Sequence, residues 1–310
     1  MDLNFNIMFG QQGLLTLCHD RDEDLMNRRW MNAMAANGIQ TELVDRATVR
    51  RMAPIINLDG RYPVQGGFLQ RRAGISRHDA VVWAYARAAS GAGVDIVQGC
   101  EVTGFEQSDS RVTAVETSRG RISGERFVMC VAGNSSHLAK LAGFRLPLRS
   151  IALQAMVTEP VKPVLDGVVS SNMIHFYVSQ SDRGELVIGG ASDYYNSYAQ
   201  RGALPATLDN ASATLEMLPC LARLRVMRQW AGVCEIAPDA SPILGPSPID
   251  NLYLSTGWGT GGFKAIPAGG DTLAWTVAKG RCHPLIEPFT LARFEQGALV
   301  DEAAAAGVAH

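Results

Sequence analysis

The chain has 310 residues, 47% of them hydrophobic and 19% charged, which is the balance of an ordinary globular protein with one large or two interleaved domains. Its formal net charge of −2 argues against broad electrostatic attraction to nucleic acid or to a membrane. The sequence has no run of eighteen apolar residues, so it predicts no membrane span. The start MDLNFNIMF lacks the features of a signal peptide.

Cysteine and histidine spacing gives no sign of a metal site or a disulfide framework. The six cysteines are widely scattered and form no CxxC pair. The six histidines show no HxH or HExxH spacing, so no metal is expected. A reduced, cytoplasmic compartment is therefore favoured.

The first part of the chain predicts short strands and two helices. Residues 4–17 favour one or two strands broken at Gly10 and Gly13, and residues 22–37 favour a helix that ends at Asn37. Residues 79–90 have a largely apolar face and predict a second helix, with Ser76 and Asp79 as candidate caps.

The remaining pattern changes twice along the chain. Strand-like runs at 94–97, 101–107, 112–117 and 127–131 lead through Gly133 into a helix ending near Leu141. Longer strands follow between residues 152 and 190, then a helix at about 210–217, a strand at 251–256 and a helix at about 270–279. This order predicts an α/β (α+β) fold in which a nucleotide-binding type of domain is interrupted by an antiparallel substrate sheet.

The strongest local signal is GWGTGGFKAIPAGG at residues 257–270, where six glycines lead from a strand into a helix. Backbone N–H groups at a helix start suit the electron-rich edge of a flavin or a phosphate. Lys264 adds a positive charge that suits a substrate carboxylate. A tight turn with a surface lysine is an equally simple interpretation.

Three segments together resemble a known family. The glycine-rich loop, RQWAGVCEIAPDASPILGP and LQRRAGISRHDAVVWAYARAA are similar to the D-amino acid oxidase superfamily of FAD-dependent oxidoreductases. They resemble more closely the β subunit of heterotetrameric sarcosine oxidase. The resemblance extends over essentially the whole chain.

The resemblance assigns an FMN site to the RHDA motif. It implies that His78 carries FMN covalently through the flavin 8-methyl carbon, with Arg77 and Arg228 near the phosphate or ring oxygens. Without the resemblance, His78 would be a polar residue near a helix start. Arg228 is equally well interpreted as a surface or salt-bridge arginine.

The resemblance also assigns contacts with a non-covalent FAD. It implies that Lys264 binds the substrate carboxylate near the FAD, and that Gly259 and Gly262 belong to the FAD-contacting loop. Val102 matches a position whose backbone reaches the adenine, and Gly133 matches a turn packed on the pyrophosphate. Their simpler interpretations are strand core for Val102 and a strand-ending turn for Gly133.

The front of the sequence departs from the family pattern. Family members begin with a strand, a GxGxxG turn and a helix, and no such unit is found in this sequence. We therefore expect a truncated form with an incomplete FAD-binding Rossmann-like domain. Residues 76–149 and 231–310 would form this region, interleaved with a mainly β substrate-binding region at 1–75 and 150–230.

The function implied by the resemblance is oxidative demethylation of sarcosine, or a similar N-methyl amino acid, to glycine with formation of hydrogen peroxide. Implied partners are α, γ and δ subunits, with tetrahydrofolate acting through the complex; nucleic acid and membrane are not expected partners. Two alternatives stay open at this point. One is a related glycine, proline or D-amino acid oxidase or dehydrogenase, and the other is a non-catalytic fragment that has lost FAD.

Overall fold

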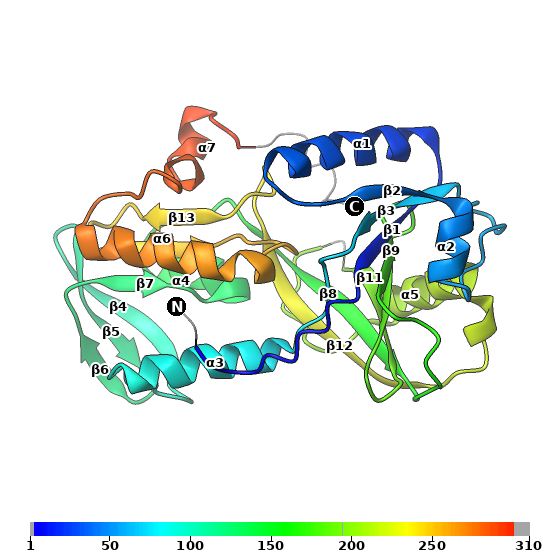
Figure 1. Cartoon of the computed structure of the whole chain (residues 1–310). Helices are drawn as coiled ribbons and strands as arrows, with labels where there is room; N and C mark the ends of the chain where they lie inside the picture. Colours follow the sequence, from blue (N-terminus) through cyan, green and yellow to red (C-terminus); the bar gives the residue numbers. More distant parts are fainter. Residues whose placement is uncertain (1–2, 194, 301–310) are drawn as a thin grey trace. The chain divides into compact units, whose positions relative to one another are not determined.

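The computed structural model describes residues 3–193 and 195–300, and the chain divides into two units (Figure 1). Unit 1 comprises residues 1–96, 154–192 and 201–231, and unit 2 comprises 97–153, 193–200 and 232–310. The chain passes between the units five times, and the crossings at 153/154 and 231/232 fall inside strands β8 (Arg149–Thr158) and β12 (Val226–Ile236). Within the described residues, no helix has both the length and the apolar character needed to cross a bilayer.

The main sheet has eight strands in the order β12-β8-β11-β10-β9-β1-β3-β2. Strand β1 pairs antiparallel with β3 and parallel with β9, so it lies inside the sheet. Its Leu15 and Leu17 are buried, because neighbouring strands cover both edges and apolar side chains cover the faces. The strands are β1 (Leu14–Cys18), β2 (Glu42–Asp45), β3 (Gly66–Gln70), β8 (Arg149–Thr158), β9 (Val168–Ser171), β10 (Phe176–Gln180), β11 (Leu186–Ser192) and β12 (Val226–Ile236).

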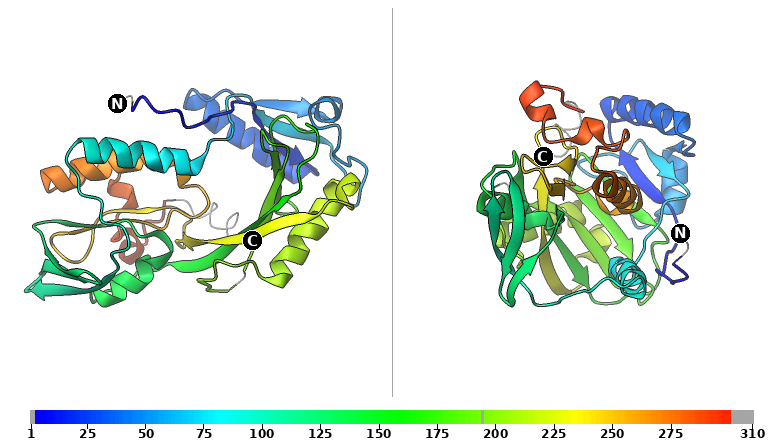
Figure 2. Two further views of the ribbon diagram at one scale, coloured as in Figure 1. Left: turned by 90° about the horizontal axis from the view of Figure 1, so that it is seen from below. Right: turned by 90° about the vertical axis from the view of Figure 1, so that its left-hand side faces the viewer.

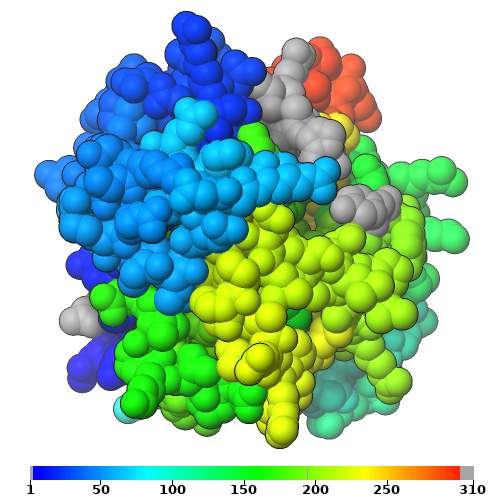
Figure 3. All heavy atoms as spheres, turned by 90° about the vertical axis from the view of Figure 1, so that its right-hand side faces the viewer, coloured from blue at the N-terminus to red at the C-terminus, as the bar shows by residue number. Residues whose placement is uncertain are grey.

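The helices of unit 1 are α1 (Arg21–Ala36), α2 (Arg46–Met52), α3 (His78–Gly91) and α5 (Leu204–Met217). Helix α5 packs on β10 and β11. The loop after α2 joins the end of α5, where the Asn57 N–H donates to the Met217 carbonyl at 2.8 Å; Figure 3 shows this face. Buried Phe176, Ile188 and Met217 belong to the apolar core of the unit.

A segment near the start of the chain, residues 7–13, lies antiparallel to residues 73–77; we call it the strap (Figure 2). The Arg77 N–H donates to the Ile7 carbonyl at 3.1 Å, and Gly10 and Ile75 form a bridge. A Cβ on Gly74 would lie 2.2 Å from the Gly10 carbonyl oxygen, so the close approach requires glycine. The strap therefore fixes the backbone from which α3 begins.

Unit 2 contains two three-stranded sheets, β13-β14-β7 and β4-β5-β6. Strand β14 pairs parallel with β7, and α6 packs on β13 and β14 (Figure 1). Buried Ile243, Leu252 and Leu254 belong to the core of this unit. The elements are β4 (Val102–Ser108), β5 (Arg111–Thr117), β6 (Gly120–Ser123), β7 (Phe127–Met129), α4 (Ser135–Leu141), β13 (Ile243–Pro246), β14 (Leu252–Thr256), α6 (Ile266–Lys279) and α7 (Arg293–Gln296), with short 3-10 turns η1 (Ala132–Asn134), η3 (Phe263–Ala265) and η4 (Glu287–Phe289). A further 3-10 turn, η2 (Pro219–Leu221), belongs to unit 1.

Several local predictions are wrong. Residues 94–97 form no strand, and three of their side chains, Val94, Ile96 and Val97, are exposed. Helices α5 and α6 both begin earlier than predicted, because a proline in the first turn is compatible with a helix start. Neither Ser76 nor Asp79 caps α3; the N-cap is Arg77, with no side-chain cap hydrogen bond.

Candidate functional site

Arg77 is the N-cap of α3 and His78 is the first residue of that helix, in unit 1. The hydrogen bond from the Arg77 N–H to the strap holds this backbone in place. The His78 side chain is exposed and makes no hydrogen bond to any other residue that the structure describes. Its imidazole is therefore accessible to a group arriving from outside the unit.

The Arg77 guanidinium is paired with its neighbour Asp79, with 2.8 Å between Nη2 and Oδ2. The hydrogen bond from Arg77 lowers the pKa of Asp79, and the same bond raises the pKa of Arg77. Asp79 also accepts a hydrogen bond from the Ala80 N–H. To bind a phosphate, the Arg77 guanidinium would have to break its ion pair with Asp79 or bind both anions at once.

Arg228 lies on β12 with an exposed side chain, and its guanidinium lies 6.0 Å from the centre of the Trp230 ring. In the described part of the chain it has no carboxylate partner, so its charge is available to an anion. No hydrogen bond or ion pair between described residues joins Arg228 to Arg77 or His78.

The glycine-rich loop of unit 2 is built around Trp258. The Trp258 Nε1–H donates to Ser255 Oγ at 3.0 Å, and the indole packs against the loop and α6. A Cβ on Gly262 would lie 2.8 Å from Trp258 Cβ, and one on Gly269 would lie 2.7 Å from Trp258 Cη2. Packing of Trp258 therefore accounts for glycine at these two positions.

Gly259 differs from those glycines. Its φ is +55°, and nothing lies within 4 Å of where its Cβ would stand. Helix α6 begins a few residues later with no side-chain cap and no acidic residue in its first turn. The Ile266 N–H donates to the Phe263 carbonyl and Pro267 has no N–H, so the helix start itself offers few free donors. The open space at Gly259 and the absence of an acidic residue in the first turn of α6 are what fit the carbonyl edge of a flavin.

Lys264 lies in η3 between that loop and α6, and its side chain is exposed. It makes no ion pair with another residue that the structure describes. Its Nζ lies 3.6 Å from the position that a Cβ on Gly261 would occupy, so the ammonium folds back over the loop. An unpaired cation there suits a carboxylate ligand.

Gly133 and Val102, the other two candidates in unit 2, have structural surroundings of their own. Gly133 is buried in η1, and a Cβ there would lie 2.5 Å from Val233 Cγ1, so the turn packs against β12. Val102 is half-buried at the start of β4, opposite Thr117. No hydrogen bond between described residues joins Val102 to the glycine-rich loop.

Two residues near the loop were not predicted from the sequence. Trp258 organises the glycines, and the buried Glu235 on β12 makes hydrogen bonds to its surroundings. The available signal for Glu235 was an acidic residue in a strand-like run that is otherwise apolar. Among the described residues, no group of three or more His, Cys, Asp or Glu is arranged to hold a metal ion.

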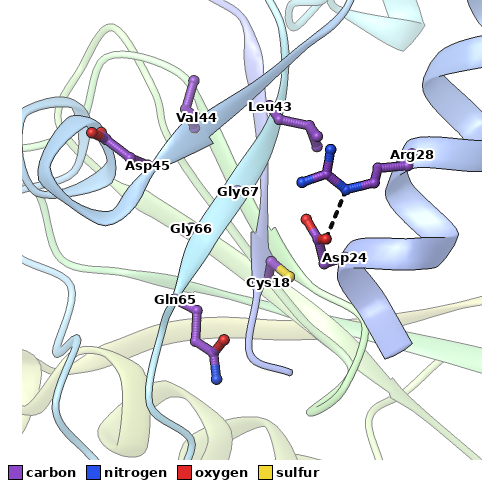
Figure 4. Close-up of a pocket in the computed structure, with 9 residues that line it drawn as sticks. All are labelled: Cys18, Asp24, Arg28, Leu43, Val44, Asp45, Gln65, Gly66 and Gly67. Atoms are coloured by element: carbon purple, nitrogen blue, oxygen red, sulfur yellow. Dashed lines mark hydrogen bonds and ion pairs between the residues drawn. The ribbon is translucent and has the colours of Figure 1, made fainter. Parts of the chain in front are cut away.

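A separate cavity of about 310 Å³ lies in unit 1 between α1, β2 and β3 (Figure 4). It contains none of the predicted site residues. Asp24 and Arg28 form an ion pair there, and burial together with nearby Glu23, Asp24 and Asp20 raises the pKa of Cys18 to about 11. The Cys18 thiol is therefore protonated and unreactive near neutral pH. The cavity is lined by Cys18, Asp24, Arg28, Leu43, Val44, Asp45, Gln65, Gly66 and Gly67.

Comparison with known proteins agrees with this geometry. The chain belongs to the family described as FAD dependent oxidoreductase (DAO), whose profile matches residues 1–275. It is 52% identical to the sarcosine oxidase subunit beta of Rhizobium meliloti, over 97% of this chain and 73% of the relative. It is 47% identical to the protein of the same name from Rhodobacter capsulatus, over 100% of this chain and 75% of the relative.

Among solved structures, L-proline dehydrogenase from P. horikoshii is similar with a TM-score of 0.87 at 23% identity, covering 95% of this chain and 79% of that one. That similarity concerns the fold. The predicted α/β (α+β) class and family resemblance are thereby confirmed, together with FAD dependence and an oxidoreductase of the sarcosine oxidase β type.

Proposed function

We propose that the chain is a β-type subunit of a sarcosine oxidase and that it oxidises sarcosine, or a similar N-methyl amino acid. The observation that carries this proposal is Lys264, an exposed cation without a described partner beside the open Gly259 backbone and the uncapped start of α6. An amino-acid carboxylate would pair with Lys264 while the open backbone of the loop lies against the flavin. The 52% identity to a sarcosine oxidase subunit supports the substrate class.

Bound FAD would supply the two-electron acceptor for amine oxidation, and oxygen, which takes up those electrons, would leave as hydrogen peroxide. The imine product would be hydrolysed to glycine and formaldehyde, or its carbon would pass to tetrahydrofolate. The chain's own residues would orient the substrate and neutralise the charge of its carboxylate. Lys264 would fix the carboxylate, and the positive end of the α6 dipole would stabilise negative charge on the flavin ring.

The remaining FAD contacts are assigned to unit 2. Gly259 and Gly262 belong to the loop at the isoalloxazine, Gly133 lies at the pyrophosphate and the Val102 backbone lies at the adenine. In this proposal residues 76–149 and 231–310 form the FAD-binding region, and residues 1–75 and 150–230 form the substrate region.

A second flavin, FMN, is assigned to His78 as a covalent group. The exposed imidazole without a hydrogen bond, at the first turn of α3, supports this assignment. The helix N-terminus and the cationic Arg77 would stabilise the anionic flavin during attachment. Arg228 would hold the phosphate or a ring oxygen.

The name of the relatives, a subunit, supports assembly with other chains, which in this proposal are α, γ and δ subunits. The direct test is an anaerobic titration of the FAD-supplemented complex with sarcosine, proline and D-alanine. Loss of flavin absorbance should be fastest with sarcosine. Faster loss of flavin absorbance with proline or D-alanine would contradict sarcosine as the proposed substrate.

A further inference from the structure

Glu235 is a carboxyl group buried inside unit 2, with 3% of its surface exposed. No cation pairs with it in the described part of the chain. Instead, its two oxygens accept hydrogen bonds from two different elements. The Ser135 N–H donates to Oε1 at 2.9 Å, and the Thr256 hydroxyl donates to Oε2.

The two partners of Glu235 adjoin the two turns assigned to FAD. Ser135 begins α4 directly after the turn that contains Gly133. Thr256 ends β14 directly before the glycine-rich loop. The Glu235 carboxyl group therefore bridges the Gly133 turn and the base of the Gly259 loop.

Backbone contacts of the same residue reinforce this bridge. The Glu235 carbonyl accepts the Gly259 N–H at 2.9 Å, and the adjacent Ile236 forms a bridge with Trp258. On the other side, Thr256 Oγ1 lies 2.6 Å from Ser135 Oγ, which donates to the Ala132 carbonyl at 2.7 Å. Polar contacts thus run without interruption from one turn to the other.

Burial of a carboxyl group is unfavourable unless its oxygens are hydrogen-bonded, and an apolar side chain here could not join two turns. We infer that Glu235 is a positioning residue, which fixes the Gly133 turn relative to the Gly259 loop and thereby the two parts of the FAD site. The statement about FAD rests on the proposed function; the bridge itself does not.

Amide hydrogen exchange of the 310-residue chain tests the bridge without flavin. Glu235→Ala removes both side-chain hydrogen bonds, whereas Glu235→Gln keeps an acceptor for the Ser135 N–H and a polar contact to Thr256. Thr256→Val removes the hydrogen bond from Thr256 to Glu235 with little change of side-chain shape. This variant replaces Glu235→Ala in the experiment if Glu235→Ala does not fold. Glu106→Ala, which removes a half-buried acid that is paired with Arg121 on β6 of the same unit and lies outside the bridge, is the control.

We expect Glu235→Ala to accelerate exchange by about tenfold or more in peptides covering residues 132–136 and 257–262, while peptides of β4–β6 stay unchanged. Glu235→Gln should restore most of the protection, and Thr256→Val should loosen mainly the loop. Unchanged exchange in both turns would overturn the bridge. Uniform acceleration through unit 2 would also overturn it, because that outcome indicates a general loss of stability.

The dissociation constant for FAD, measured by fluorescence on the same variants, separates this inference from the proposed function. A several-fold weaker affinity in Glu235→Ala, absent in Glu106→Ala, is expected. Local loosening with unchanged FAD affinity would support the bridge and refute the assignment of these turns to FAD.

Discussion

Lys264 is the only charged residue between positions 257 and 270, so its contribution can be tested separately from that of the loop backbone. Lys264→Met should raise the apparent KM for sarcosine and lower turnover, with a combined loss of about 1.5–3 kcal/mol for a charged hydrogen bond. Steady-state peroxide assays on the complex measure this loss. Methylamine, which has no carboxylate, should be affected much less; an equal loss for both substrates would assign the lysine to the flavin or to oxygen.

His78 gives a prediction that does not depend on catalysis. If FMN is attached there, the denatured β chain from a co-expressed complex should retain flavin fluorescence at its gel band, and His78→Ala should abolish it. His137→Ala, at another exposed histidine, is the control. Fluorescence that persists in His78→Ala would exclude this residue as the attachment point.

Asp239 and Arg293 form a buried ion pair in unit 2, with 2.8 Å between Nε and Oδ2 and side chains that are 0% and 2% exposed. Burial raises the pKa of Asp239, but hydrogen bonds from Arg293 and the Val300 N–H together with the Arg293 charge outweigh it, so the net pKa is lowered. The folded pKa is therefore below the unfolded value. The stabilisation is complete above the unfolded pKa and is lost as pH falls through the folded one.

Asp239→Asn should lower the free energy of unfolding near neutral pH by about 3–5 kcal/mol, since it leaves the Arg293 charge buried without a partner. Urea unfolding at several pH values measures this difference between the variant and the natural chain. The difference should shrink as pH falls below about 4. A difference that stays constant across this range would show that shape, rather than charge, accounts for the stability.

At the scale of elements, the strap gives a prediction about the start of α3. Gly74→Ala places a methyl group against the Gly10 carbonyl and should separate residues 7–13 from residues 73–77. Faster proteolytic cleavage before residue 20 and less flavin on His78 are the expected results. Gly91→Ala, at the end of α3 with open space around its Cβ, should leave both unchanged; equal behaviour of the two variants would contradict the role of the strap.

Elements with their own periodicity or turn signals could be predicted from the sequence, including α1, α3, β4, β5 and β14. The short strands β2, β3 and β9 could not, because their pairing partners lie elsewhere in the chain and four or five residues give little pattern. The 94–97 run shows the opposite error: its residues favour a strand, but the described structure offers them no neighbour to pair with.

The site followed the same rule. The glycine-rich loop and Lys264 are contiguous in sequence, so the sequence alone marks them as candidates; their contacts with FAD and substrate stay a prediction. Glu235 was missed because its role depends on Ser135 and Thr256, which are distant along the chain. Trp258 was missed because the glycines around it also suit a ligand, and only coordinates show that Gly262 and Gly269 accommodate the indole.

At the scale of the whole molecule, the 310-residue chain should bind FAD weakly by itself. Tight binding of a dinucleotide in this kind of fold depends on a strand, a GxGxxG turn and a helix aimed at the pyrophosphate, and this sequence contains no such unit. Calorimetric titration with FAD should give a dissociation constant above about one micromolar, or weaker than roughly −8 kcal/mol. A smaller dissociation constant would show that the residues of this chain bind FAD tightly without a GxGxxG unit.

The division into units has a consequence for synthesis on the ribosome. Unit 1 takes its segments from three stretches, the last ending at residue 231, and unit 2 uses the stretches between and after them. Neither unit can therefore complete its core until most of the chain has been translated. Nascent chains that stop at about residue 150 would expose apolar strands of both units, so this protein should depend on chaperones during synthesis more than one whose domains follow one another. For the same reason, no continuous stretch of the sequence contains the whole of either unit, so neither unit can be expressed as a single uninterrupted fragment.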